Sequence, residues 1–252
     1  RGTSLTGSVS LNSNKAERGA GLYILSTGAE FSSLSVYMNT TSSGAASGIY
    51  ARADFTVNAN MYMCNELTLD KNAKLIRKGI TNFLSGGEST SCDITVLDPS
   101  NGRVLVDYSD ASNTDTLTST GSYTLTNAGY KLAVSGKKLV LNTIQYTITY
   151  ALNGGSDVAT SQTYNIETNL TLLGTPAKTG YTFGGWKVTT AGGNWTNDTT
   201  FTASQNIGTG KYGNITLTAQ WTPIQYTITY ALNGGSGVAT SQTYNIETNL
   251  TL

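Results

Sequence analysis

A near-exact internal repeat occupies much of the second half of this sequence. Residues 144–172 read IQYTITYALNGGSDVATSQTYNIETNLTL, and residues 224–252 repeat this segment with one change, from Asp157 to Gly237. Shared physical constraints fix only a hydrophobic pattern, so near-identity over this length indicates a recent tandem duplication. The repeat predicts an array of small domains that fold by the same rules, and we expect the natural chain to continue with further copies.

The residues inside one copy are typical of β-strands joined by tight turns. Residues 146–150 alternate Tyr and Ile with Thr, which is the period of a strand with one buried face. The segment Asn153-Gly154-Gly155 supplies positive φ for a hairpin turn, and a second strand is expected at 160–166. Residues 215–221 alternate again before a short linker at 222–223. We expect the core of the domain to consist of Phe183, Trp186, Trp221 and the inward-facing tyrosines.

Three aromatic and glycine-rich segments resemble a known repeat family. The motifs Y-T-I-T-Y-x-x-N-G-G, G-Y-T-F-G-G-W and L-T-A-Q-W begin at residues 146, 180 and 217. Their order is similar to that of the Listeria–Bacteroides repeat, the B-repeat of internalin-type bacterial surface proteins. The resemblance covers residues 146–222 and the partial copy at 226–252. It implies a small β-grasp-like domain, arrayed in tandem between a recognition domain and the cell envelope.

The composition predicts an all-β fold for the whole chain. Charged residues make up only 12% of the sequence, about half the usual share, and Thr, Ser, Asn and Gly supply the polarity instead. Thr and Tyr favour a pleated, half-exposed surface, while Gly and Asn reach the positive φ that tight turns need. Residues with high helix propensity are scarce, so we expect almost no helix.

Residues 1–143 form a predicted domain of their own, with a looser rhythm. The segment Gly21-Leu22-Tyr23-Ile24 is echoed by Gly48-Ile49-Tyr50-Ala51, and each precedes a Phe-containing alternating stretch. Short strands at this spacing are typical of the rungs of a right-handed parallel β-helix, with a β-sandwich as the alternative. The region loosely resembles the β-helix repeats of bacterial polymorphic surface proteins.

The end of this region changes character. Turn residues at 98–102 and 127–129 predict hairpins over 94–108 and 122–134, followed by a last strand at 138–141. Such a run would cap a β-helix and lead into the first repeat. The predicted domains are therefore 1–143, a first repeat at 144–223 and a partial second repeat at 224–252.

The charge pattern argues against nucleic acid and membrane partners. The chain has 15 basic and 15 acidic residues and a formal net charge of zero, so nothing concentrates cations against phosphates. The sequence lacks an apolar run near the ~18 residues that a membrane span needs. A solvated strand edge or loop is expected at the densest basic stretch, which consists of Lys71, Lys74, Arg77 and Lys78.

The sequence gives little support for catalysis. The chain has no histidine, which removes the commonest general base and every Ser-His or Cys-His arrangement. We therefore expect no enzymatic activity, no catalytic residue and no cofactor. The densest acidic cluster is Asp107, Asp110 and Asp115, which is expected to be a polar loop, with a calcium site or paired catalytic carboxylates as alternatives.

Two cysteines and a tryptophan remain as candidate special positions. Cys64 and Cys92 are the only cysteines, and without histidine they fit no common zinc site, so they form either one disulfide or two buried thiols. Trp195 lies in the Gly-, Asn- and Thr-rich stretch 188–212, which is longer than the usual connection in the repeat family. It is either a packing residue or a sugar contact. Further aromatic candidates for sugar contacts are Tyr23, Tyr37, Tyr50 and Tyr212.

These observations predict a secreted structural or adhesion protein of the cell surface, whose repeats act as a stalk. The expected partners are glycans or proteins on a host or neighbouring cell. One alternative is a carbohydrate-binding accessory region of a larger extracellular enzyme. Another is a subunit of a self-assembling surface fibre or layer, in which the chain is its own partner.

Overall fold

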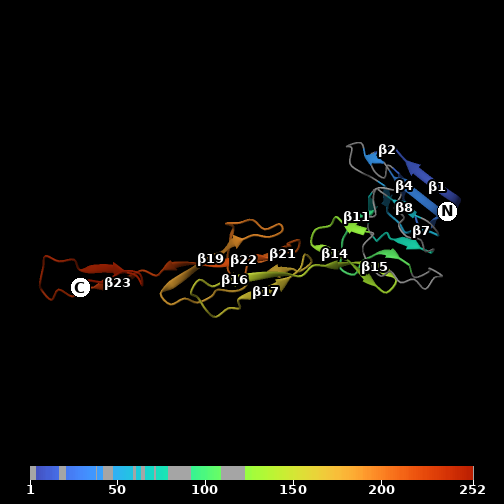
Figure 1. The fold of residues 1–252 in the computed structure, drawn as a ribbon. Coiled ribbons are helices and arrows are strands. Elements are labelled where there is room, and N and C mark those ends of the chain that lie inside the picture. The colour runs from blue at the N-terminus through green and yellow to red at the C-terminus, as the bar shows by residue number, and fades with distance from the viewer. Residues whose placement is uncertain are drawn as a thin grey trace. The chain divides into compact units, whose positions relative to one another are not determined.

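The computed structural model describes residues 4–16, 21–37, 39–41, 48–58, 61–63, 66–70, 72–78, 92–108 and 123–251. Every regular element in this part of the chain is a β-strand, as the composition predicted. The chain divides into two compact units, Arg1–Ile144 and Gln145–Leu252, here called unit 1 and unit 2 (Figure 1).

The described residues of unit 1 form two large sheets and one small one. The first sheet contains β1 (Ser4–Asn12), β4 (Ala29–Tyr37), β7 (Phe55–Val57), β8 (Met61–Met63), β10 (Leu75–Arg77), β12 (Val104–Asp107), β14 (Tyr130–Ser135) and β15 (Lys138–Thr143). The second contains β3 (Leu22–Ile24), β6 (Ile49–Ala51), β9 (Leu67–Leu69), β11 (Cys92–Val96) and β13 (Tyr123–Leu125). The small sheet pairs β2 (Lys15–Ala16) with β5 (Thr40–Thr41).

Successive passes of the chain add parallel strands to these sheets. The second sheet has the order β13-β11-β9-β6-β3, and each of its ladders is parallel. The first has the order β1-β4-β7-β10-β12-β15-β14, with β8 beside β4, and its ladders are parallel from β1 to β12. Parallel ladders favour the β-helix interpretation over a β-sandwich, whose sheets are antiparallel. The handedness and the resemblance to polymorphic surface proteins stay predictions.

The echoed segments of the sequence are neighbours in the second sheet. Leu22 pairs with Ile49, Tyr23 with Tyr50 and Ile24 with Ala51. The next passes continue the apolar column inside the sheet, because Leu67 pairs with both Ile49 and Ile94 and all three are buried. Like side chains in register remove apolar surface from water pass after pass, and this burial is the main stabilising contribution in unit 1.

The two hairpins predicted near the end of unit 1 are wrong. Strands β11 and β12 lie in different sheets, so residues 98–102 form a corner between sheets. Strands β13 and β14 are separated in the same way. A turn sequence marks a change of direction but does not decide whether the next strand pairs with the previous one. The antiparallel hairpin here is β14–β15, which ends the first sheet by pairing β15 with β12.

The basic stretch also differs from its prediction as a solvated edge. Arg77 is 1% exposed and stands in register with the buried Val57 of the neighbouring pass. Lys74 and Lys78 do face outward, and each forms an ion pair, with Asp107 and Glu30 respectively. Lys71 lies outside the described residues. The spacing of the charges does not reveal that Arg77 is buried. In the short strand β10, side chains point alternately to the two faces, and the sequence does not say which face is the buried one.

Unit 2 contains one complete repeat and the hairpin of the next copy. Its strands are β16 (Tyr146–Ala151), β17 (Ser161–Tyr164), β18 (Leu170–Thr171), β19 (Tyr181–Thr190), β20 (Thr200–Phe201), β21 (Asn206–Gly208), β22 (Ile215–Pro223), β23 (Tyr226–Thr229) and β24 (Ser241–Tyr244). The main sheet has the order β17-β16-β22-β19-β20. Strands β16 and β22 are parallel, and the other ladders of this sheet are antiparallel. Parallel first and last strands at the centre are the β-grasp-like arrangement that the family resemblance implied.

Local features of the repeat match the sequence-based predictions closely. Asn153 and Gly154 have positive φ, at 50° and 83°, in the predicted hairpin turn. The same hairpin forms in both copies, with Tyr146 opposite Tyr164 and Tyr226 opposite Tyr244. The predicted linker at 222–223 is instead the end of β22. Pro223 is accommodated there because a terminal strand position needs no further ladder hydrogen bond from its nitrogen.

The core of unit 2 lies on one face of the main sheet. Trp186 and Tyr150 are fully buried and meet edge to face, with ring centroids 4.8 Å apart. Phe183 and Trp221 are partly buried at its edge. The remaining buried members of the core are Ile148, Tyr164, Leu170, Leu172, Val188, Trp195, Ile215, Leu217 and Ala219.

Candidate functional site

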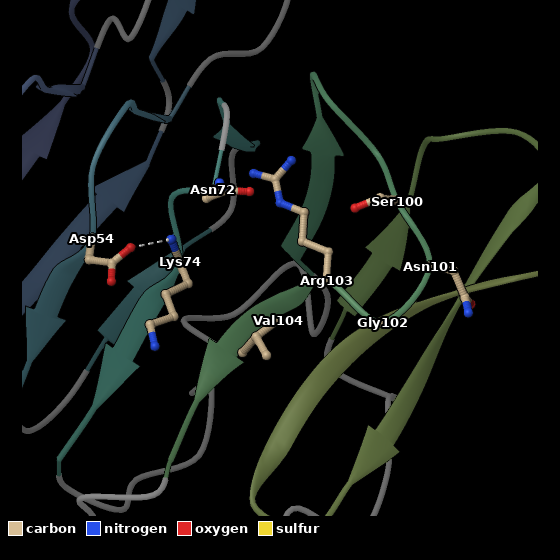
Figure 2. Close-up of a pocket in the computed structure, with 8 residues that line it drawn as sticks. All are labelled: Asp54, Asn72, Lys74, Ser100, Asn101, Gly102, Arg103 and Val104. Carbon is tan, nitrogen blue, oxygen red and sulfur yellow. Dashed lines mark hydrogen bonds between the residues drawn. The ribbon is translucent and has the colours of Figure 1, made fainter. Parts of the chain in front are cut away.

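A polar pocket in unit 1 is the first candidate for a binding site. It has a volume of about 440 Å³ and lies where the corner at 98–102 faces the turns that precede β7 and β10 (Figure 2). Its lining consists of Asp54, Asn72, Lys74, Ser100, Asn101, Gly102, Arg103 and Val104.

Two neighbouring passes of the chain place Asp54 and Lys74 beside each other. Each residue immediately precedes a strand of the first sheet, and Phe55 and Leu75 pair in register. The backbone N–H of Lys74 donates to Asp54 Oδ1 at 3.1 Å, as Figure 2 shows. The Lys74 ammonium donates to Asp107 Oδ2 at 3.2 Å. The position of each polar side chain therefore follows from strand register.

Arg103 connects the corner to the body of unit 1. The residue is 8% exposed, and its Nη1 donates to the carbonyl oxygen of Asp98 at 2.6 Å. Its Nη2 lies 3.5 Å from the carbonyl oxygens of Leu69 and Ala73. Burial lowers the pKa of Arg103, and the carboxylates of Asp98 and Asp70 act in the opposite direction. This side chain fixes the shape of the pocket wall, since its terminal nitrogens are already engaged with backbone.

The corner itself is held by the terminal strand of unit 1. Gly102 has a φ of 78°, and its N–H donates to the carbonyl oxygen of Leu141 at 2.7 Å. The N–H of Thr143 donates to Asn101 Oδ1 at 3.1 Å. The pocket lining thus presents a carboxylate, an ammonium group, amides and a hydroxyl on a fixed backbone. Such a set can hydrogen-bond a hydroxyl-rich ligand.

Trp195 is placed in the core of unit 2. It is 6% exposed, and its indole N–H donates to the hydroxyl of Tyr164 at 2.7 Å. Phe201 meets the indole edge to face at 5.8 Å, and the Lys211 ammonium lies 4.9 Å from the ring centroid. The predicted ligand contact at Trp195 remains untested, and this burial leaves little of the ring for a sugar to stack on.

The stretch 188–212 therefore carries Trp195 inward. Its course depends on the close approach of Gly192 and Gly193 to Gly213, where a Cβ would meet backbone atoms at 2.4 Å or less. Asn194 fixes the same crossing, because its N–H donates to the Tyr212 carbonyl and its Oδ1 accepts from the Tyr212 N–H. Residues far apart in sequence make this contact, so spacing gave no signal for it.

The other aromatic candidates are engaged with neighbours. Tyr23 stacks on Tyr50 with ring centroids 5.0 Å apart, and Tyr212 packs against Tyr146 at 6.4 Å. Nothing is described for the side chain of Tyr37. Tyr23 is 41% exposed, which makes it the most accessible ring among the described candidates.

The acidic cluster and the cysteine pair fall partly outside the described residues. Asp107 is buried and accepts from Lys74, and Lys138 Nζ lies 3.7 Å from the same oxygen; Asp110 and Asp115 are not described. Within the described residues, no group of three or more His, Cys, Asp or Glu is arranged to hold a metal ion.

Cys92 is buried in β11, and this burial raises the pKa of its thiol to about 12. Cys64 lies outside the described residues, so the disulfide stays a prediction. No helix in the described part of the chain is long and apolar enough to cross a membrane.

Comparison with known proteins identifies the complete repeat. Residues 146–220 match the family model of the Listeria-Bacteroides repeat domain, a family that occurs in bacterial surface proteins. No curated protein and no solved structure matched the chain. The matched residues run from the start of β16 almost to the end of β22, so the family boundary coincides with the five-stranded sheet. Residues 146–220 of this chain are a Listeria-Bacteroides repeat domain.

Proposed function

We propose that the chain is part of a secreted, adhesive surface protein in which the repeats form a load-bearing stalk. The duplicated repeat and the family match support this role, because tandem domains of one kind extend a chain by a constant increment per copy. The expected setting is the outside of a bacterial cell, where unit 1 contacts a host or neighbouring cell and the repeats carry the tension.

The single observation that carries the proposal is the parallel pairing of β16 with β22. The chain enters the repeat at the start of β16 and leaves it at the end of β22, which lie at opposite ends of the shared ladder. A pull along the stalk therefore loads the hydrogen bonds from Ile148–Ile215 to Ala151–Thr218 together, in shear. An antiparallel hairpin pulled at its two ends would instead open one bond at a time. The topology suits a domain that must stay folded under tension.

Single-molecule pulling of the full chain tests this proposal. We expect the repeat to unfold at a clearly higher force than a simple hairpin, because unfolding under load depends on the barrier rather than on equilibrium stability. Ile148→Ala, in the loaded ladder, is expected to lower that force. Val188→Ala is the matched control, since this buried side chain lies in β19, outside the loaded pair.

Equal effects of the two substitutions on the unfolding force would contradict the shear mechanism. Unfolding of the unsubstituted repeat at the force of a simple hairpin would contradict the load-bearing role itself.

A second candidate function is carbohydrate binding by unit 1. The polar pocket supports it, because its lining combines donors and acceptors on a rigid corner (Figure 2). Neutral sugars are the matching ligand class, since hydroxyl groups both donate and accept hydrogen bonds.

A glycan array probed with the full chain tests this second candidate, followed by calorimetric titration with any saccharide that binds. Asn72→Ala is expected to weaken binding several-fold, because Asn72 lines the pocket and its side chain is exposed. Asn169→Ala removes an exposed asparagine from unit 2 and is expected to leave affinity unchanged. Absence of binding to any saccharide, or equal weakening by both substitutions, would contradict the assignment.

A further inference from the structure

The junction between the complete repeat and the next copy is short and hydrogen-bonded. Strand β22 ends at Pro223 and β23 begins at Tyr226, so two residues connect them. The first of these, Ile224, donates its N–H to the carbonyl oxygen of Gly180 at 2.9 Å. Gly180 immediately precedes β19, the strand that pairs with the end of β22. The connection is therefore tied to the body of the complete repeat.

A turn of the second copy lies against the same place. Ile246 packs on Gly180 so closely that a Cβ on that glycine would stand 2.7 Å from the Ile246 Cδ1. The neighbouring Glu247 accepts a hydrogen bond through Oε1 from the Tyr181 hydroxyl at 2.9 Å. Within the complete repeat, the Lys178 ammonium lies 4.2 Å from the centroid of the Tyr181 ring. An apolar contact and a hydrogen bond thus join the second copy to two adjacent residues of the complete repeat.

The turn that makes these contacts has the same internal hydrogen bonds in both copies. In the second copy, Asn245 Oδ1 accepts from the Glu247 N–H and from the Thr248 hydroxyl, both at 2.9 Å. The first copy has the same bonds around Asn165 Oδ1, at 2.9 Å from the Glu167 N–H and 3.2 Å from the Thr168 hydroxyl. This Asx turn holds Ile and Glu side by side in both copies.

We propose that the turn at residues 245–248 is a docking element that seats on the Gly180–Tyr181 step and holds consecutive copies of the repeat in one relative orientation. Gly180 serves two purposes there. Its φ of 78° is in the left-handed region, and its missing side chain makes the space that Ile246 occupies. The partner of this surface is the next copy of the same repeat.

A Gly-Tyr step of the same geometry precedes the first copy as well. Gly129 has a φ of 79°, and its carbonyl oxygen accepts from the Ile144 N–H at 3.0 Å. Tyr130 pairs with Thr143 at the end of the preceding strand, as Tyr181 pairs with Pro223. Each copy of the repeat is thus preceded by a glycine with positive φ and a tyrosine, and in each case the glycine carbonyl oxygen accepts a hydrogen bond from the isoleucine N–H at the start of the copy. This recurrence supports the step as a functional element of the array.

The docking contact would make a stalk of such repeats resist bending, and only this consequence rests on the proposed stalk function. NMR of the full chain with isotope-labelled isoleucine methyl groups tests the contact directly. We expect a nuclear Overhauser effect between the Ile246 δ1 methyl group and the Gly180 Hα. We also expect amides in β23 and β24 to show the same slow tumbling as those in β22.

Matched glycine substitutions separate docking from backbone strain. Gly180→Ala and Gly208→Ala both place a Cβ at a left-handed residue, with φ of 78° and 81°. Gly208 has no atom within 4 Å of the added Cβ, whereas Gly180 faces Ile246. Only Gly180→Ala is expected to remove the Ile246 contact and to release β23 and β24 into faster motion.

A titration of Tyr181 provides a second readout on the folded protein. The hydrogen bond to Glu247 raises the pKa of Tyr181, so Glu247→Gln is expected to lower the pKa followed by NMR of the Tyr181 ring. Fast independent motion of β23 and β24 in the unsubstituted chain, or equal effects of the two glycine substitutions, would overturn the docking proposal. A flexible stalk would still be compatible with high unfolding force, so this failure is distinguishable from failure of the load-bearing role.

Discussion

At the scale of single residues, Trp195 shows how a partner far along the chain decides a role. Its indole N–H donates to the Tyr164 hydroxyl, which in turn donates to the carbonyl oxygen of Gly213. A buried indole needs such a partner, because an unpaired N–H would lose its hydrogen bond to water. This relay joins β17 to the ends of the long connection between β19 and β22.

Substitution of Trp195 by Phe is expected to lower the free energy of unfolding of unit 2 by about 1–3 kcal/mol, because Tyr164 loses its donor and the core loses volume. Urea unfolding followed by fluorescence of the remaining tryptophans measures it. In a double-mutant cycle with Tyr164→Phe, we expect coupling of about 1 kcal/mol. Strict additivity of the two substitutions would show that the relay contributes nothing of its own.

At the scale of single elements, β16 shows how the alternation of buried and exposed side chains changes the environment of a tyrosine. Its inward residues Ile148 and Tyr150 are buried, and Thr147 and Thr149, which alternate with them, are exposed. The Tyr150 hydroxyl donates to Gln162 Oε1 at 2.8 Å and accepts from the Leu173 N–H at 3.2 Å. Burial raises the pKa of Tyr150 to about 12, although the Leu173 N–H favours the ionised form.

This shift predicts that unit 2 loses stability in alkali. In the unfolded chain Tyr150 releases its proton near pH 10, whereas the folded strand retains the proton to about pH 12. The unfolded state therefore binds fewer protons between these values, and the free energy of unfolding falls as pH rises through them. The contribution of Tyr150 is up to about 3 kcal/mol. The pKa of Tyr164 is also raised by burial and acts in the same direction.

Urea midpoints measured by tryptophan fluorescence from pH 8 to pH 12 test the alkaline effect. Tyr150→Phe is expected to start from lower stability but to depend less on pH above 10. A variant whose midpoint falls as steeply as that of the parent chain would assign the alkaline loss to other groups.

At the scale of the whole molecule, two compact units imply two unfolding transitions. The three tryptophans, Trp186, Trp195 and Trp221, all lie in unit 2, so their fluorescence reports on that unit alone. Far-ultraviolet circular dichroism reports on the strands of both. We therefore expect the two probes to give transitions that do not coincide.

A pair of core substitutions assigns each transition. Leu67→Ala, in the apolar column of unit 1, and Leu217→Ala, in the core of unit 2, each replace a fully buried leucine. Each is expected to cost about 2–5 kcal/mol in its own unit. Leu217→Ala alone should move the fluorescence transition. Movement of the fluorescence transition by Leu67→Ala to the same extent would show that the units unfold as one.

Much of unit 2 was determined by the sequence itself. Strict alternation in residues 146–150 and 215–221, positive-φ residues at 153–154 and the duplication predicted its strands, turn and repeated hairpin, because these signals are local and depend on one residue and its neighbours. The echo of residues 21–24 at 48–51 similarly predicted two strands with the same inward face, and they are neighbours in one sheet.

Tertiary structure alone decided which strands pair and which polar groups are buried. The corner at 98–102 and a hairpin turn look alike in sequence, because both need the same left-handed glycine. Burial of Arg77, the inward course of Trp195, the pocket around Lys74 and the seat on Gly180 all depend on contacts between residues distant along the chain. Side-chain type and spacing describe one strand at a time, whereas these features arise from the register between strands.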